Sequence, residues 1–209
     1  MNQRDDIMKH YFGPHANRDG FQISVSGARP SSRGYVTLES SNPKELPIID
    51  PQYLSQQDDL RRLVEGFKLA MEVGRTRALR EGLDADLFAE HLPGCEKYEL
   101  YSEPYLYCYV LNLAGSDRHA CCTAKMGSKE DPMAVVDSKL RVKGVKNLRV
   151  IDSSVMPEVT TGNIFIPTTM VAERGADLIR GRIIKPIAPP VADYERALNS
   201  LENSKNPIL

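Results

Sequence analysis

The chain has 209 residues, of which 41% are hydrophobic and 26% are charged, a composition typical of a globular protein that can bury a core. Its 27 basic and 28 acidic residues give a formal net charge of −1, and Trp is absent, so the sequence predicts no nucleic-acid partner. No apolar run approaches the roughly 18 residues that a bilayer-spanning helix needs, so we expect no membrane segment in this chain.

The four cysteines form no CxxC pair, and two of them are adjacent. An adjacent pair cannot easily supply two ligands to one tetrahedral zinc ion, and few histidines lie near, so the sequence predicts no metal site. We interpret the cysteines as buried or half-buried free thiols. They are Cys95, Cys108, Cys121 and Cys122.

The N-terminal quarter of the chain contains two candidate strands. Residues 1–20 are polar and irregular, whereas residues 21–25 and 35–39 alternate apolar and polar side chains, as half-buried strands do. The prolines that follow keep the next segment extended rather than helical. These are Pro43, Pro47 and Pro51.

A helix is predicted from a capping box at residues 55–58 to Gly74, because apolar side chains recur along it at helical spacing. Residues 82–118 favour short helices and carry several tyrosines. Those tyrosines could line a substrate cavity, but interior packing is the preferred interpretation. They are Tyr98, Tyr101, Tyr105, Tyr107 and Tyr109.

Short strands are predicted again at residues 135–136, 140–142 and 148–151. A helix then starts near Pro167 and ends at Gly181, and a Pro-containing linker leads to a short polar helix from Asp193 to about Leu201. Strands and helices follow one another without a βαβ rhythm. The sequence therefore predicts an α+β fold in which helices flank a mixed or antiparallel sheet.

Two polar side chains could carry chemistry. His119 has an imidazole that can take a proton from a hydroxyl group, although a single histidine is more often structural. Asn163 precedes the last predicted helix, where its amide could hold a substrate oxygen or simply cap the helix. The first turn of that helix also presents unpaired N–H groups, which can stabilise an anion. These residues alone decide nothing.

Four collinear blocks resemble the C-terminal domain of glucose–methanol–choline (GMC) oxidoreductases. The first is RPSSRGYVTLESSNPKELPIIDPQYLS from Arg29, and the second, HACCTAKMG from His119, is similar to the family's HPxGTCxMG. The third, VVDSKLRVKGVKNLRVIDSSVMP, is similar to VVDPxLRVxGVxxLRVVDASIMP, and TTGNIFIPTTMVAERGADLI is similar to SGNxxAPTxMIAEKAADxI. The resemblance covers roughly residues 20–182.

The resemblance implies a flavoenzyme that oxidises small alcohols with FAD, choline dehydrogenase being one example, by hydride transfer to the flavin. His119 matches the family's catalytic histidine, the general base, and Asn163 matches the second catalytic position, occupied by His or Asn. Cofactor-binding positions are implied at the end of the third block and at the start of the last helix. They are Asp152, Ser153, Asn163, Ile164, Pro167 and Thr168.

The chain also departs from the family. The Pro-x-Gly after the histidine is replaced by residues 120–122, so a Cβ stands where the family has glycine, and the dinucleotide-binding GxGxxG is absent.

We therefore expect three parts. Residues 1–20 are an irregular segment, and residues 183–209 are a linker and a short helix. By the resemblance, residues 21–182 are the substrate and catalytic domain with the last strand and helix of the FAD domain. We expect the N-terminal FAD domain to be a missing partner and the isolated chain to be inactive. The alternative is a non-catalytic binding or structural remnant without flavin.

Overall fold

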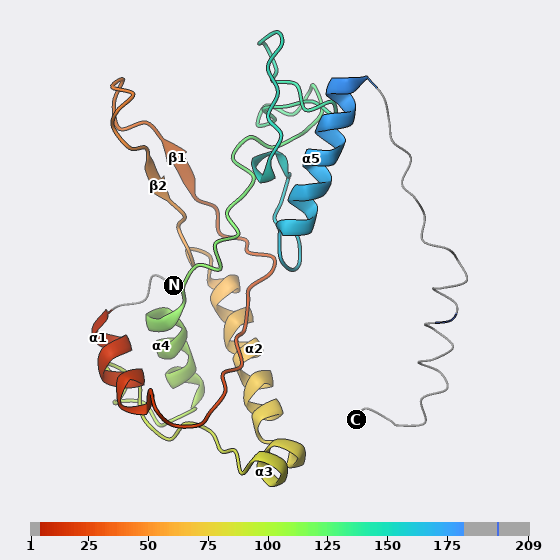
Figure 1. The fold of residues 1–209 in the computed structure, drawn as a ribbon. Coiled ribbons are helices and arrows are strands. Elements are labelled where there is room, and N and C mark those ends of the chain that lie inside the picture. The colour runs from red at the N-terminus through yellow and green to blue at the C-terminus, as the bar shows by residue number, and fades with distance from the viewer. Residues whose placement is uncertain (1–4, 182–195, 197–209) are drawn as a thin grey trace.

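The computed structural model describes residues 5–181 and residue 196, so the linker and helix expected beyond residue 182 lie outside the described residues except for that one position. The described chain contains short helical turns at its start, one hairpin and four longer helices (Figure 1). In order, the elements are α1 (Asp5–Ile7), η1 (Met8–Phe12), η2 (Gly13–His15), β1 (Tyr35–Thr37), β2 (Ile48–Asp50), α2 (Gln57–Gly74), α3 (Arg77–Leu83), α4 (Glu103–Leu113), η3 (Ser153–Val155) and α5 (Phe165–Arg180).

Helix α2 confirms the helix predicted from the apolar stripe, but its start differs from the expected capping box. The N-cap residue is Gln56, and no side chain caps the helix there. Instead, the backbone N–H of Gln56 donates to the Ser32 hydroxyl at 3.1 Å, and that hydroxyl in turn donates to Asp59 at 2.5 Å. A segment distant in sequence therefore replaces the local cap, because Asp59 faces residues 31–32.

The main core lies among the helices at the base of Figure 1, where the apolar stripe of α2 packs against α4. Tyr105 of α4 is fully buried, and its hydroxyl accepts from the N–H of Leu92 at 3.1 Å. Tyr101 and Tyr109 pack around it, which supports interior packing as the role of the tyrosine-rich segment. The buried members of this core are Ile7, Tyr11, Val64, Met71, Leu92, Cys95, Tyr105, Leu106, Val110 and Leu113.

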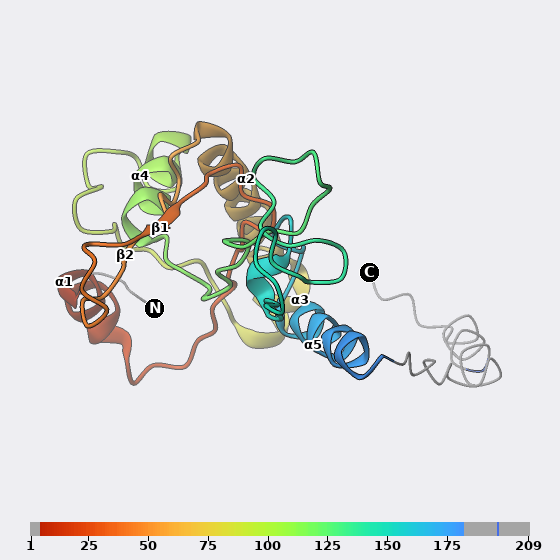
Figure 2. The same cartoon turned by 90° about the horizontal axis from the view of Figure 1, so that it is seen from above.

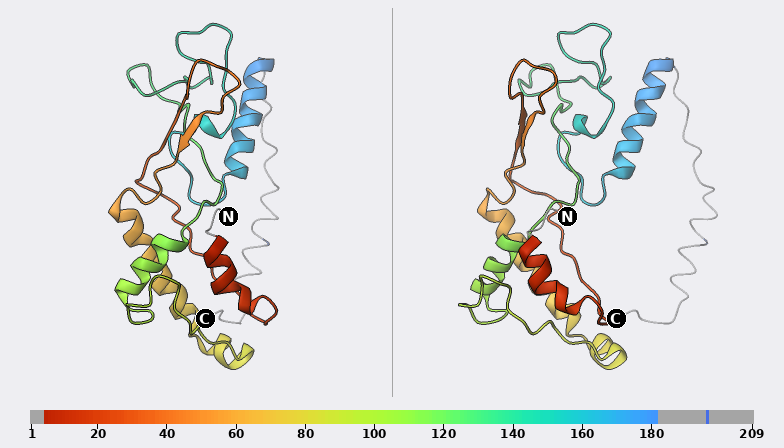
Figure 3. Two further views of the ribbon diagram at one scale, coloured as in Figure 1. Left: turned by 90° about the vertical axis from the view of Figure 1, so that its left-hand side faces the viewer. Right: turned by 60° about the vertical axis from the view of Figure 1, so that its left-hand side comes forward.

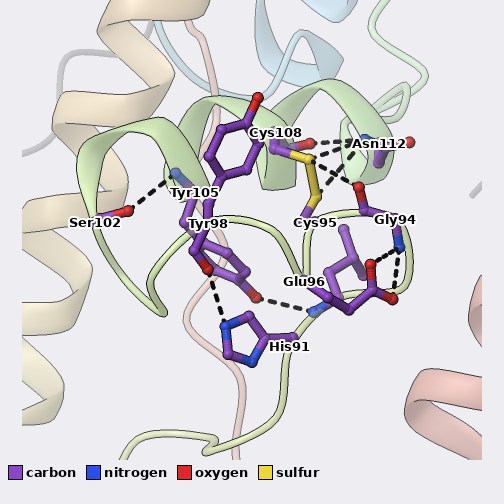
Figure 4. Close-up of a disulfide and its surroundings, with 10 residues drawn as sticks. His91, Gly94, Cys95, Glu96, Tyr98, Ser102, Tyr105, Cys108 and Asn112 are labelled. Carbon is purple, nitrogen blue, oxygen red and sulfur yellow. Dashed lines mark hydrogen bonds between the residues drawn. A yellow bond between two sulfur atoms is a disulfide. The ribbon is translucent and has the colours of Figure 1, made fainter.

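The interpretation of the cysteines as free thiols is wrong. Cys95, in the loop before α4, forms a disulfide with Cys108 on that helix (Figure 4). Cys121 and Cys122 form a second disulfide between adjacent residues. The pairing of Cys95 with Cys108 depends on how the loop folds back onto α4, a proximity that the sequence spacing does not reveal.

The hairpin confirms the strand expected from residue 35, over three of its residues. Strand β1 pairs antiparallel with β2, with Tyr35 opposite Asp50. The strand expected at residues 21–25 does not form. The alternating pattern is present, but this segment has no strand beside it, and the Val25 side chain instead occupies the space over Gly66 of α2.

The strands expected between residues 135 and 151 are likewise reduced to isolated bridges, Met126 with Val136, Val136 with Val142, and Arg141 with Arg149. Tight turns occupy most of this stretch. Helix α5 forms as predicted and ends at Gly181, whose φ of +69° is the left-handed conformation of a C-cap glycine. The mixture of helix and strand is thus confirmed, but the sheet has only two strands among the described residues.

A second, smaller core joins the bridged loops to α5. Its buried members are Val136, Leu140 and Val155. Gly175 of α5 allows a close approach to Ile151, since a Cβ there would lie 2.4 Å from an Ile151 methyl carbon. Figures 1, 2 and 3 show α5 on the side of these loops opposite to the hairpin. No helix within residues 5–181 has the length and apolarity to cross a membrane.

Candidate functional site

The segment that carries His119 is held against η3. His119 follows α4 by six residues, and the run after it makes three backbone hydrogen bonds to the 153–155 segment. The N–H of Cys122 donates to the Ser153 carbonyl at 3.3 Å, and the next two bonds, from residues 124 and 126, measure 2.9 Å and 2.8 Å. This ladder brings two sequence-predicted regions together, the histidine segment and the turn that begins at Asp152.

The imidazole of His119 is half-buried and has no hydrogen bond or ion pair to any other described residue. Its ring nitrogens are therefore available to a ligand. Two backbone positions close to it adopt left-handed conformations, Arg118 with φ +59° and Cys122 with φ +78°. Cys122 stands where the GMC motif has glycine, so the chain retains at this position a conformation that favours glycine.

Asp152 organises the turn that receives the ladder. Its carboxylate accepts from the N–H of Ser154 at 2.8 Å and caps the short helix η3. The side chain remains exposed, and the carbonyl of Ser153 is occupied by Cys122. The carboxylate thus has a structural role within the chain and still faces outward, where a hydroxyl group of a ligand could reach it.

Asn163 lies just before Ile164, the N-cap residue of the last helix, which has no side-chain cap. Its Oδ1 accepts from the N–H of Phe165 at 2.8 Å, and the side chain is exposed. With Oδ1 occupied, the amide Nδ2 is the group left to donate. The preceding Gly162 has φ +112°, a conformation that only glycine adopts without strain, and it turns the chain into α5.

The first turn of α5 has fewer backbone N–H groups without an acceptor than the first turn of most helices. Phe165 donates to Asn163, Thr168 donates to the Ile164 carbonyl at 2.9 Å, and Pro167 has no N–H group. Within the described chain this leaves the N–H groups of Ile164 and Ile166 without an acceptor. Two such N–H groups can bind one small anion or one polar edge of a ring, but they are too few to bind an extended phosphate chain.

The predicted residues therefore form two groups. One joins the His119 segment to Asp152 and Ser153, and the other contains Asn163 and the start of α5. Among the described residues no hydrogen bond or ion pair connects His119 with Asn163. The second core links the groups, because Val155 of η3 packs with Val171 of α5.

Two hollows of the surface lie away from these two groups. One of about 480 Å³ lies beside α3 and is lined mainly by charged side chains, Arg75, Arg77 and Arg80 among them. Another of about 170 Å³ lies between Arg33 and Glu158. Neither of these two hollows contains a sequence-predicted site residue. Within residues 5–181, no three His, Cys, Asp or Glu side chains gather as metal ligands would.

Sequence reasoning overlooked two features beside the site. The adjacency of Cys121 and Cys122 was visible, but their disulfide was not anticipated. Asp137 was also overlooked, although it organises the turn of the third motif block: its carboxylate accepts from Arg141, which lowers the pKa of Asp137 to about 2. An Asp four residues before an Arg in a turn was the available signal.

Comparison with known proteins settles the family. A model described as GMC oxidoreductase matches residues 30–172. The chain belongs to the GMC oxidoreductase family. It is 41% identical over 165 residues to "Glucose dehydrogenase [FAD, quinone]" of Drosophila pseudoobscura pseudoobscura, covering 78% of this chain and 26% of that protein. It is 39% identical to the mitochondrial choline dehydrogenase of Homo sapiens, covering 79% of this chain and 27% of the relative.

Solved structures agree with this assignment. Pyridoxine 4-oxidase from Mesorbium loti superposes with a TM-score of 0.63 at 30% identity, over 75% of this GMC chain and 29% of the other. A fungal aryl-alcohol oxidase superposes with a TM-score of 0.59 at 29% identity, over 73% and 24% of the two chains. The GMC chain described here spans about a quarter of the length of the relatives it matches.

Proposed function

We propose that this chain is the substrate-binding and catalytic portion of an FAD-dependent oxidoreductase that acts on the CH–OH group of a small alcohol. Membership of the GMC family carries the proposal, and the ladder that holds the His119 segment beside Asp152 supports it. Relatives named as glucose and choline dehydrogenases and an aryl-alcohol oxidase share hydroxyl-bearing substrates. These names support a small hydroxyl-bearing compound as the proposed class of substrate.

His119 is proposed as the general base. A half-buried imidazole with no partner in the described chain can accept the proton of a substrate hydroxyl without first breaking another contact. The ladder after it anchors the backbone of this segment to η3, which holds the segment near Asp152. Loss of such a base costs roughly 10²–10⁴ in rate.

Asn163 is proposed to hold the oxygen of the substrate. Its Oδ1 accepts from Phe165, which fixes the amide plane and directs Nδ2–H as the available donor. A donor at this position stabilises negative charge that develops on the oxygen as His119 removes the proton. One side chain would thereby accept from the first turn of α5 and donate to the substrate oxygen.

The residues at the start of α5 fit the ring end of a flavin. The N–H groups of Ile164 and Ile166 lack acceptors in the described chain, and the positive end of a 16-residue helix favours negative charge. Pro167 and Thr168 would lie along the same edge of the flavin ring. Asp152 and Ser153 would lie near the ribityl or phosphate region of the cofactor. Bound FAD would supply the hydride acceptor. The sequence contains no glycine-rich loop that could bind the ADP part of FAD.

We further propose that the expected N-terminal FAD domain covers apolar surface left open here. Both faces of the hairpin are uncovered, with Ile49 68% exposed, and a two-stranded sheet alone is marginally stable in water. Phe165 and Ile166 of α5 are similarly exposed, at 68% and 70%. Because α5 belongs to a second core separate from the helical one, we assign α5 as the last helix of that FAD domain, and residues 148–151, which form only an isolated bridge here, as the segment that would complete its last strand.

The catalytic roles are tested in the complete enzyme that carries this sequence. We expect His119→Ala to lower the rate of flavin reduction by substrate ~10²–10⁴-fold in stopped-flow measurements. Asn163→Asp is the matched variant, because it retains the Oδ1 acceptor for Phe165 but removes the amide donor. It should leave the melting temperature near that of the wild type and still lower the rate. An unchanged rate in the His119 variant removes this residue from the mechanism.

The dependence on an FAD domain is tested with the 209-residue chain itself. We expect the purified chain to contain no stoichiometric flavin by absorbance, to be inactive, and to bind a hydrophobic dye through the exposed hairpin and α5. Stoichiometric flavin would contradict the proposed dependence. A cooperatively melting, monodisperse chain that binds no dye would instead favour the non-catalytic alternative, a separate binding or structural protein.

A further inference from the structure

We propose that the Cys121–Cys122 disulfide is a redox-active site, opened by dithiol reductants, that sets the conformation of the segment carrying His119. The proposal of a redox-active disulfide rests only on the geometry of the segment that carries His119. Only its consequence for catalysis depends on the function proposed for His119.

The ring closed by this disulfide is too small to stabilise the fold as a whole. A disulfide constrains the unfolded chain more as the loop it closes becomes longer. Cys95 and Cys108 are 13 residues apart in sequence, whereas Cys121 and Cys122 are neighbours. The adjacent pair therefore acts on local backbone geometry, while the other disulfide secures a loop to α4.

The local geometry that it constrains is unusual for cysteine. Cys122 has φ +78°, a conformation that costs free energy for any residue with a Cβ, and the GMC motif has glycine at this position. The sulfur–sulfur bond restricts Cys121 and Cys122 to conformations compatible with the ring. Once the bond is reduced, nothing in the covalent structure opposes the return of Cys122 to negative φ.

The return of Cys122 to negative φ would disturb the ladder next to His119. The Cys122 N–H donates to the Ser153 carbonyl, and this is the ladder bond closest to the histidine. At 3.3 Å it is also the longest of the three, so it is the first we expect to break. The bond from Ala124 follows at 2.9 Å, and the bond from Met126 lies furthest from the disulfide. Reduction thus frees the His119 segment progressively from η3.

The two disulfides differ in their access to reductant. Cys121 and Cys122 are both half-buried, so both residues of this pair keep some contact with solvent. Cys95 is fully buried in the helical core, and attack on Cys108 would have to expel a Cys95 thiolate into apolar surroundings. We therefore expect the adjacent pair to open first.

The reaction is a thiol–disulfide exchange. A thiolate of the dithiol attacks one sulfur of the pair, the bond between Cys121 and Cys122 breaks, and the released cysteine takes up a proton. The second thiol of the reductant then displaces the other cysteine, forms an intramolecular disulfide, and completes the transfer of two electrons. The chain gains two electrons and two protons, which convert its disulfide into two thiols, and the dithiol is oxidised to a disulfide.

The experiment titrates the 209-residue chain with dithiothreitol, alkylates it at each concentration, and follows both disulfides by peptide mass spectrometry. Amide hydrogen exchange is recorded on the same samples. We expect a range in which Cys121 and Cys122 are alkylated while Cys95 and Cys108 remain paired. In that range the Cys122 and Ala124 amides should exchange ~10-fold faster or more. Simultaneous opening of both disulfides, or unchanged exchange after selective opening, overturns the proposal.

Two variants isolate the role of the backbone. Both replace Cys121 with Ser, and they carry either Cys122→Gly or Cys122→Ser. Glycine adopts φ near +78° without a link, so the glycine variant should keep slow exchange in this segment with or without reductant. The serine variant should exchange rapidly in both conditions. Equal exchange in the two variants would overturn the proposal, and neither readout depends on catalysis.

Discussion

The carboxylate of Asp59 offers a quantitative test of how the N-terminal segment is attached to α2. This side chain is 7% exposed and accepts from the N–H of Ser31 at 2.7 Å and from the N–H and hydroxyl of Ser32 at 2.7 Å and 2.5 Å. We consider Asp59→Asn. One amide oxygen can still accept from Ser31, but the NH₂ group would face the N–H of Ser32, a donor against a donor.

The expected cost follows from these contacts. A hydrogen bond to a charged group contributes about 1.5–3 kcal/mol, and a buried N–H left unsatisfied costs about 1–3 kcal/mol. Since the bonds share one carboxylate and are not additive, we expect Asp59→Asn to lower the free energy of unfolding by about 3 kcal/mol. For a chain of this size that corresponds to a fall in melting temperature of about 6–12 °C.

The penalty should depend on pH in a defined direction. Burial raises the pKa of Asp59, but the hydrogen bonds from Ser31 and Ser32 together outweigh it, and the net pKa lies below the ordinary value. A carboxylate with a depressed folded-state pKa stabilises the fold above its unfolded pKa of about 3.9 and loses that contribution as pH falls through the folded value. The difference between wild type and variant should therefore be full at pH 7 and shrink below about pH 4.

The assay is urea denaturation of both proteins at pH 7 and at several acidic pH values. Asp58→Asn is the matched control, because solvent screens the ion pairs of that neighbouring carboxylate with Arg61 and Arg62, so their loss should change the free energy of unfolding little. A penalty at Asp59 below about 0.5 kcal/mol, or one that stays constant from pH 7 to pH 3, would refute the reasoning.

Two glycines give further predictions, with Gly82→Ala as a common control. A Cβ at Gly34 would lie 2.2 Å from the Asp50 carbonyl oxygen, a backbone atom that cannot move aside, so Gly34→Ala should open the base of the hairpin at a cost of about 1–3 kcal/mol or more in urea denaturation. Gly175→Ala would place its Cβ against the Cγ2 methyl of Ile151, a β-branched side chain packed in the second core, so it should also lower the free energy of unfolding. Gly82 meets nothing within 4 Å, and its replacement should stabilise α3 by about 0.5–1 kcal/mol. Equal effects at Gly34 and Gly82 would contradict the packing argument.

Local signals predicted the two longest helices well, whereas α3 was not predicted and the bounds of α4 were left open. The apolar stripe located α2 to within two residues of its start, and Gly181 ended α5 where a glycine C-cap was expected. Both signals depend on residues three or four positions apart along the chain, which contact one another in any helix. Prediction succeeded where the determining contacts were near in sequence.

Features that depend on a distant partner were missed. The alternation at residues 21–25 was real, but a strand also requires a neighbouring backbone, and that segment lies along α2 instead. The start of α2 is stabilised by Ser32, far outside the window of a capping box. The pairing of Cys95 with Cys108 likewise depends on the fold of an entire loop.

For the candidate site, the sequence by itself determined which residue types are present and, through its motif blocks, the family to which they belong. Only the tertiary structure decided how they are held: the ladder that anchors the His119 segment to Ser153, the Phe165 N–H donor that orients Asn163, and the left-handed Cys122 closed by its disulfide. The physical reason is that chemical identity is a property of each side chain, whereas orientation arises from hydrogen bonds to backbone groups that folding brings near.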